Sequence, residues 1–193
     1  CNTGHKLDKM AVFVPAGSVV SECLARQEEP ASQDVAFIHP REENPMALML
    51  LDLDNGQFLA HPKTAPEGSR AKRKVLHTLE ILELNTRDLL VQRRIDAFTD
   101  YKRLLREYVA IKHASTHEAL RDASGGHPEI DDAASLEDER QRLLMCVRTQ
   151  LGRQPHPAVW VEIWRSPVMS KKIREWMAAA PELSPLLVLG LAA

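Results

Sequence analysis

Hydrophobic residues form two short runs, separated by turn residues, between positions 47 and 60. The runs 47–53 and 57–60 flank the tripeptide Asp54-Asn55-Gly56. An Asn-Gly pair favours the positive φ angles of a tight turn between antiparallel strands. The pattern therefore predicts a β-hairpin whose strands are these two runs.

From residue 71 onward, the hydrophobic spacing changes to that of α-helices. Apolar side chains recur every three to four positions over residues 71–84, which predicts a first helix that Asn85 ends. The same spacing continues over residues 87–112 and predicts a longer second helix, with Thr86 as its N-cap.

The last third of the chain predicts shorter helices bounded by capping residues, proline and glycine. Ser135 and Asp138 have the spacing of a capping box, so a helix is expected to start there and to continue to Leu151, where Gly152 closes it. The other predicted elements are a short helix from Ser115 to Gly125, helices over 158–165 and 170–179, and a turn at Pro181. Together these patterns predict a mainly α fold with one small β-hairpin.

Charge is distributed unevenly, although the chain as a whole is nearly neutral. The 193 residues include 25 lysines and arginines and 27 aspartates and glutamates, a net charge of -2, which does not mark the whole chain as a polyanion binder. Residues 22–54 hold eight acids against two bases, as in a solvated acidic loop. Residues 70–106 hold ten bases against five acids.

The basic segment has two interpretations. Its charges can form the solvated outer faces of two amphipathic helices. Alternatively, they can face phosphates, because each phosphate that a lysine or arginine neutralises releases counterions and adds affinity. Contact with nucleic acid is expected first where the bases are densest, at Arg70, Lys72, Arg73 and Lys74.

Composition indicates a soluble globular protein. Hydrophobic residues make up 44% of the chain and charged residues 27%, which fits one domain. The longest apolar run, residues 185–193, is far shorter than the roughly 20 residues of a membrane-spanning helix, so no membrane is expected. Cys1, Cys23 and Cys146 form no CxxC pair, which favours a reducing cytoplasm over a disulfide framework.

The most informative cluster is the first six residues, Cys1-Asn2-Thr3-Gly4-His5-Lys6. If this segment opens a helix, Asn2 and His5 share one face, and an amide oxygen and an imidazole can reach the same divalent cation. Lys6 would then lie beside the cation as a point charge for phosphate. The alternative is a frayed polar terminus.

Cys1-Asn2 followed by His5-Lys6 resembles the last part of an HNH endonuclease motif. The version it resembles belongs to the Septu (PtuB-like) and retron-associated nucleases of bacterial defence. Later features follow in the order of that family: Phe13-Val14-Pro15, the predicted hairpin, a helix that ends in Leu82-Glu83-Leu84-Asn85, and an arginine-bearing helix from Arg87. The resemblance covers most of the chain through short, degenerate motifs.

The resemblance implies a remnant of a ββα-metal fold at the N-terminus and metal-dependent hydrolysis of nucleic acid. Asn2 and His5 would be ligands of Mg²⁺ or Mn²⁺, with Zn²⁺ as an alternative. The general-base histidine of the family would precede Cys1, so this chain alone is expected to be inactive. The implied partners are nucleic acid, DNA in preference to RNA, and a partner ATPase.

On this interpretation the chain divides by sequence content. Residues 1–66 would hold the end of the HNH motif, the acidic segment and the hairpin, and residues 67–193 would form a helical region. The family's usual glycine after the lysine is replaced by Leu7, and the run from there to Pro15 is longer than in the family. By the resemblance, Asn2 corresponds to the last residue of the motif in its asparagine form, and His5 would be a second ligand.

A non-catalytic helical module for protein interaction is the competing interpretation. It rests on the large helical share, the apolar tail and the tryptophans Trp160, Trp164 and Trp176, which otherwise serve as core residues. His113 and His117 have the i, i+4 spacing of helical metal ligands. However, a helix that starts at Ser115 would separate them and leave both as exposed polar residues.

Overall fold

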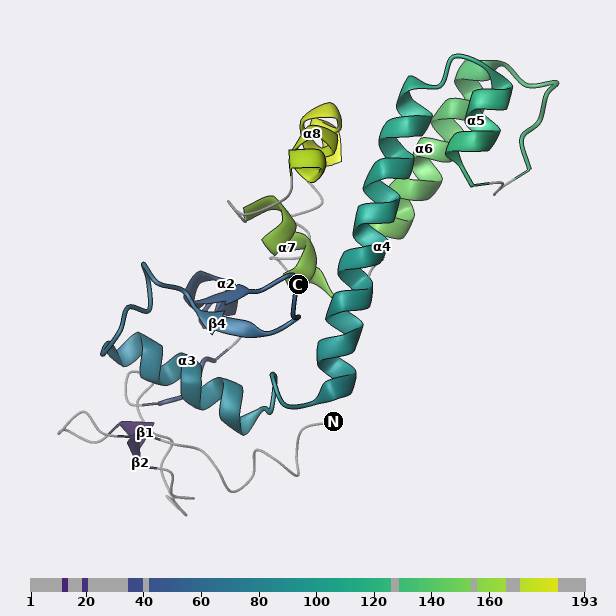
Figure 1. The fold of residues 1–193 in the computed structure, drawn as a ribbon. Helices are drawn as coiled ribbons and strands as arrows, with labels where there is room; N and C mark the ends of the chain where they lie inside the picture. Colours follow the sequence, from purple (N-terminus) through teal and green to yellow (C-terminus); the bar gives the residue numbers. More distant parts are fainter. Residues whose placement is uncertain are drawn as a thin grey trace. The chain divides into compact units, whose positions relative to one another are not determined.

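The computed structural model describes residues 12–13, 19–20, 35–39, 42–125, 129–153, 156–165 and 171–183. The chain forms two compact units, Cys1–Ile95 and Asp96–Ala193, and their boundary lies inside the longest helix, α4 (Asp88–His113). Figure 1 shows the elements of both units. The fold is mainly α, as the sequence predicts. The predicted division of the chain into residues 1–66 and 67–193 is based on the motifs that each part contains, and it stays a prediction.

The predicted β-hairpin lies in the first unit. β3 (Met49–Leu51) pairs antiparallel with β4 (Phe58–Ala60), which confirms the prediction from the two apolar runs. A further antiparallel pair, which the apolar pattern does not predict, joins β1 (Val12–Phe13) to β2 (Val19–Val20).

The first predicted strand is shorter than its apolar run, because residues 47 and 48 belong to a helical turn. This turn, α2, spans Pro45–Leu48. The side chain of Asn44 accepts a hydrogen bond from the backbone nitrogen of Met46, at 3.0 Å, and a proline occupies the first helical position. An asparagine cap followed by proline is a strong helix start, and here it prevails over the apolar run.

The loop between β3 and β4 is wider than a tight Asn-Gly turn. Gly56 has a φ of 69°, whereas Asn55 does not adopt a positive φ. The backbone nitrogen of Asp52 donates to the carbonyl of Gln57, and the nitrogen of Gly56 donates to the carbonyl of Asp52, both at 2.8 Å. The Asp52 carboxylate also accepts from the backbone nitrogen of Asp54 at 2.9 Å. The aspartate therefore organises the loop, and only the glycine needs the left-handed conformation.

α3 (Arg70–Ile81) follows the hairpin and contacts β4 (Figure 1). Its buried face includes Val75, Thr78 and Leu79, one helical turn apart. The hydroxyl of Thr78 accepts a hydrogen bond from the backbone nitrogen of Ile38, at 3.0 Å, and so joins the preceding segment to the helix. Because apolar residues and this hydroxyl share one face, α3 closes the core of the first unit.

α3 ends at Ile81, before the predicted end at Leu84. Glu83 has a φ of 51°, and two hydrogen bonds surround it: Leu84 nitrogen to Leu79 carbonyl and Glu83 nitrogen to Glu80 carbonyl, both 3.0 Å. This is the Schellman arrangement, in which glycine usually occupies the left-handed position. A glutamate here conceals the helix end from sequence analysis.

Asn85 does not end α3 but pairs with the hairpin. Its amide accepts a hydrogen bond from the backbone nitrogen of Phe58 and donates one to the Phe58 carbonyl, both 2.8 Å, as a neighbouring strand would. From α4, Nη1 of Arg94 donates to the carbonyls of Gly56 at 2.9 Å and Leu84 at 2.8 Å. These two side chains fix the hairpin to the α3–α4 connection.

In the described residues of the second unit, all regular secondary structure is helical. α4 buries a stripe that includes Tyr101, Leu105 and Tyr108, and Figure 1 shows α5 and α6 beside the C-terminal half of this helix. None of the helices in the described part of the chain has the length and apolarity that crossing a membrane requires. The unit's further elements are α5 (His117–Ala123), α6 (Leu136–Gly152), α7 (Pro157–Arg165), α8 (Lys171–Ala179) and the 3₁₀ turn η2 (Pro181–Leu183).

The predicted capping box of α6 is confirmed. The hydroxyl of Ser135 accepts from the backbone nitrogen of Asp138 at 3.1 Å and donates to its carboxylate at 2.6 Å. At the start of α5 the prediction is wrong by one residue. Thr116 and not Ser115 is the N-cap, because its side chain accepts from the backbone nitrogen of Ala119 at 3.0 Å.

A polar cluster joins α4 to the end of α8 and to η2. Nζ of Lys112 donates to the Ala179 carbonyl at 2.8 Å and to Glu182 at 2.9 Å, and the Tyr108 hydroxyl donates to Glu182 at 3.2 Å. Partial burial raises the pKa of Glu182, but hydrogen bonds from Lys112 and Tyr108 outweigh it and lower that pKa overall. Burial, followed by the Glu182 charge, raises the pKa of Tyr108 to about 12.

Candidate functional site

The predicted metal site lies outside the described residues. Asn2, His5 and Lys6 all fall in a part of the chain whose placement is not described. Within the described ranges, no group of three or more histidine, cysteine, aspartate or glutamate side chains could hold a metal ion. The metal ligands therefore stay a prediction from the resemblance.

The predicted phosphate contacts lie at the start of α3. Ser69 is the N-cap, and its hydroxyl accepts from the backbone nitrogen of Lys72 at 3.0 Å. At roughly 100° per residue, Arg70, Arg73 and Lys74 share one side of the helix, whereas Lys72 lies on another. The sequence run is therefore not one continuous patch.

Two lysines of this basic run are paired with acids from outside the helix. Nζ of Lys74 lies 2.6 Å from Glu43, and only 13% of the Lys74 side chain is exposed. Lys72 pairs with Glu67, whose own side chain is 86% exposed. The hydrogen bond and charge of Lys72 lower the pKa of Glu67. Nη1 of Arg73 donates to the Gly68 carbonyl at 3.0 Å.

The first turn of α3 lacks the acidic residues that helices favour there. It carries Arg70, Lys72 and Arg73 but no aspartate or glutamate. Because the helix N-terminus already bears a partial positive charge, basic side chains add to the local potential where acids would offset it. An anion placed near this turn is attracted by the side chains and by the helix end together.

The two histidines with i, i+4 spacing lie on different helices. His113 is the last residue of α4, and His117 is the first residue of α5. Nε2 of His117 lies 3.2 Å from the Ala134 carbonyl, a contact that ties α5 to the segment before α6. The expected break between the two histidines is confirmed, although its cap is Thr116.

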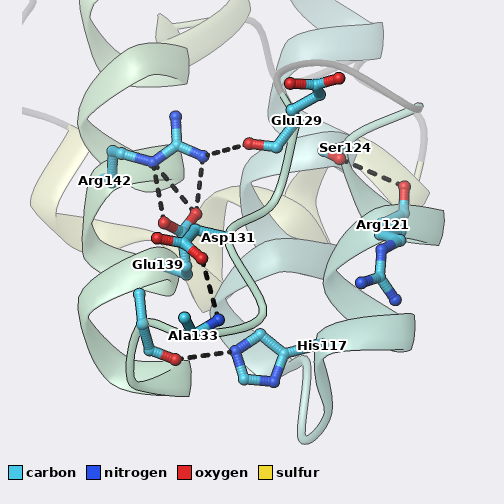
Figure 2. A network of polar contacts seen from close by, with 9 residues as sticks. His117, Arg121, Ser124, Glu129, Asp131, Ala133, Glu139 and Arg142 are labelled. Atoms are coloured by element: carbon cyan, nitrogen blue, oxygen red, sulfur yellow. Dashed lines mark hydrogen bonds and ion pairs between the residues drawn. The ribbon is translucent and has the colours of Figure 1, made fainter.

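A polar network around α5 and α6 was not indicated by the sequence (Figure 2). Arg142 donates to the carboxylate of Glu139, at 2.6 and 3.0 Å, and to the Glu129 carbonyl at 3.0 Å. Glu139 is buried, and Asp131 accepts from the backbone nitrogen of Ala133 at 2.9 Å. In the sequence, the i, i+3 spacing of Glu139 and Arg142 was the signal that could have indicated this ion pair. These contacts hold residues 129–135 against the two helices.

Two of the three tryptophans form an aromatic cluster on α7. The rings of Trp160 and Tyr101 have centroids 5.0 Å apart, and those of Trp160 and Trp164 are 5.7 Å apart in an edge-to-face arrangement. Trp160 is buried, which supports the core interpretation for this residue. Neither indole N–H has a hydrogen-bond partner within the described residues.

Comparison of the chain with protein-family models, with curated proteins and with solved structures found no match.

Proposed function

We propose that this chain is the C-terminal portion of an HNH-type, metal-dependent endonuclease of bacterial defence. The observation that carries the proposal in the described part is the first turn of α3, where Arg70, Lys72 and Arg73 stand at the positive end of the helix and the turn itself contains no aspartate or glutamate. Such a turn attracts the phosphates of a nucleic acid backbone. Its function would be to hold the substrate.

The catalytic chemistry of the proposal rests on the resemblance. Asn2 and His5 would hold Mg²⁺ or Mn²⁺, which when bound polarises a scissile phosphate and stabilises the leaving 3′ oxygen. Lys6 would contact an adjacent phosphate. No residue of this chain is assigned as the general base, so the chain by itself is expected to bind DNA without cutting it.

Among the four basic residues, Arg70 and Lys72 are the best targets for a binding test. Arg70 is exposed, and the ion pair of Lys72 is with a glutamate at the surface, which a phosphate can replace. Lys74 is mostly covered and paired with Glu43, so it is the least available. The matched control is Lys171→Gln with Arg174→Gln, two exposed residues of α8.

The test measures binding of a fluorescein-labelled 20-base-pair DNA duplex by anisotropy between 50 and 200 mM KCl. Each lost phosphate contact reduces the slope of log K against log salt by about 0.9. R70Q/K72Q should therefore lower the slope by about two, and K171Q/R174Q should leave it unchanged. Equal effects in both double variants, or no binding by the parent chain, would contradict the proposal.

The placement of the active site is tested separately by incubating the chain with plasmid DNA and MgCl₂ or MnCl₂. No cleavage is expected. If the chain cuts DNA and Asn2→Ala abolishes cutting, then a complete active site lies within this sequence and the proposed division of roles is wrong.

A helical interaction module is the second candidate, and the tryptophans favour it. Two indole N–H groups of α7, on Trp160 and Trp164, lack acceptors among the described residues, and such groups usually find a partner when buried. Binding to a protein partner that is insensitive to salt and weakened by Trp164→Ala would support this function. Trp176→Ala is the control, since that ring lies on α8 with Lys172 5.9 Å above it.

A further inference from the structure

In the second unit, a pocket of about 830 Å³ that is partly open to solvent lies between α4, the C-terminal end of α5, and α6. Small-molecule sites in proteins usually have volumes of roughly 300 to 1,000 Å³. All lining residues belong to the second unit, so the cavity is independent of the basic turn of α3. Its volume lies within this range, so it is large enough to admit a small organic ligand.

Each of the three helices contributes one small side chain to the lining of the cavity. α4 contributes Ala110, α5 contributes Ala123, and α6 contributes Cys146. A leucine or methionine at one of these positions would fill part of the volume, as in ordinary helix packing. These three residues provide an apolar surface for the body of a ligand.

Charged groups line the cavity from α4 and from α5, whereas α6 contributes no charged residue to it. On α4, Nη1 of Arg103 donates to Glu107 at 3.0 Å, so these two charges compensate each other. Arg106 and, from α5, Asp122 complete the charged lining. The lining is neutral in total, and it therefore tolerates a single added charge better than a double one.

Arg106 is the group with unused hydrogen-bonding capacity. It is exposed, and it forms no hydrogen bond or ion pair within the described part of the chain. Burial raises the pKa of the Glu107 carboxyl, and the charges of Arg103 and then Arg106 offset only part of this rise. A guanidinium presents N–H groups in a planar fork that matches a carboxylate. The Gln150 amide lies at the same cavity.

We propose that this cavity binds a small organic monocarboxylate. Arg106 holds the carboxylate, and the apolar body of the ligand lies against Ala110, Ala123 and Cys146. A phosphate monoester, with its second negative charge, binds more weakly because Asp122 and Glu107 face the same volume. A neutral analogue of the same shape lacks the anchoring group.

Cys146 makes the proposal measurable, since its thiol lines the cavity and is half-buried. In the full chain with Cys1→Ser and Cys23→Ser, this thiol is the one left for iodoacetamide, a neutral reagent, and mass spectrometry follows the rate. Benzoate is the probe, benzyl alcohol the neutral control and phenyl phosphate the dianionic one. Sodium chloride keeps the ionic strength constant.

Benzoate at ten times its dissociation constant should slow alkylation about tenfold, because only the free protein reacts. At the same concentration phenyl phosphate should protect less, and benzyl alcohol should not protect. Arg106→Gln should remove the protection, and Arg174→Gln should preserve it. Equal protection by benzoate and benzyl alcohol, or protection that persists in R106Q, would overturn the proposal.

A second measurement keeps the test decisive if the thiol reacts too slowly. Titration of benzoate into ¹⁵N-labelled protein should shift the backbone amide of Gly125, at the end of α5 in the cavity lining. Ala110→Leu should abolish that shift while the far-ultraviolet circular dichroism stays unchanged. If R106Q, which removes no buried group, retains the full shift, then the cavity has no carboxylate site at this arginine.

Discussion

The guanidinium of Arg94 is expected to be the most important polar group of the first unit. Only 7% of this residue is exposed, and Nη1 donates to two backbone carbonyls, of Gly56 in the hairpin loop and Leu84 after α3. Its guanidinium carbon lies 4.7 Å from the centre of the Phe58 ring. Arg94→Met keeps an unbranched apolar stem and removes all three contacts.

The expected loss follows from the contacts. A hydrogen bond to a charged group contributes about 1.5 to 3 kcal/mol, and so the two bonds of Arg94 contribute about 3 to 6 kcal/mol before any cost. Burying the cation costs part of this gain, as the lowered pKa of Arg94 indicates. In R94M, the carbonyls of Gly56 and Leu84 are left without this hydrogen-bond donor. We expect R94M to lower the free energy of unfolding by about 2 to 4 kcal/mol.

Urea denaturation followed by circular dichroism measures the effect, and Arg93→Met is the matched control. Arg93 is the preceding residue on the same helix and is exposed, so its replacement should change the free energy of unfolding by less than about 0.5 kcal/mol. If R94M and R93M destabilise the protein equally, the bridge to the two carbonyls contributes nothing and the reasoning is wrong.

Three further predictions follow from backbone geometry and burial. Gly56→Ala should destabilise the protein by at least about 1 kcal/mol more than Gly68→Ala. Both glycines have a positive φ, but only a Cβ at Gly56 would meet a backbone oxygen, that of Val91, at 2.8 Å. Equal losses of stability in urea denaturation would exclude this clash. Glu83→Gly should raise the free energy of unfolding by about 0.5 kcal/mol, because glycine adopts its left-handed φ without strain, and a lowered thermal midpoint would contradict this. Because the pKa of Tyr108 is raised, its protonated hydroxyl contributes fully to the free energy of unfolding below pH 10, and this contribution is lost as the pH rises toward about 12. Tyr108→Phe should therefore flatten the fall in stability at alkaline pH. An unchanged profile of stability against pH would refute this.

Elements with local signals could be predicted from the sequence. The hairpin follows from two apolar runs around a turn, and α6 follows from Ser135 and Asp138, whose contacts span three residues. Element ends were less predictable where two local signals compete. The Asn44 cap took residues 47 and 48 out of the strand, and Glu83 ended α3 in a conformation that usually indicates glycine.

Contacts between residues far apart in the sequence could not be predicted. The role of Asn85 depends on Phe58, and that of Arg94 depends on the position of the hairpin loop. From local capping signals alone, Asn85 is identified as a helix end. The sequence contains no information about the strand that its amide faces in the fold. Side-chain partners of this kind become evident only once the elements have packed.

The same limit applies to the candidate nucleic-acid contacts. A charge count gives all four bases at the start of α3 equal weight, but Lys74 is 13% exposed and paired with Glu43 from another segment. Its charge is therefore used within the fold, and removing it would test stability as much as binding. Arg70 and Lys72 stand at the helix end, where the backbone adds positive potential and the competing acid lies in water. The experiment on nucleic-acid binding therefore targets these two residues.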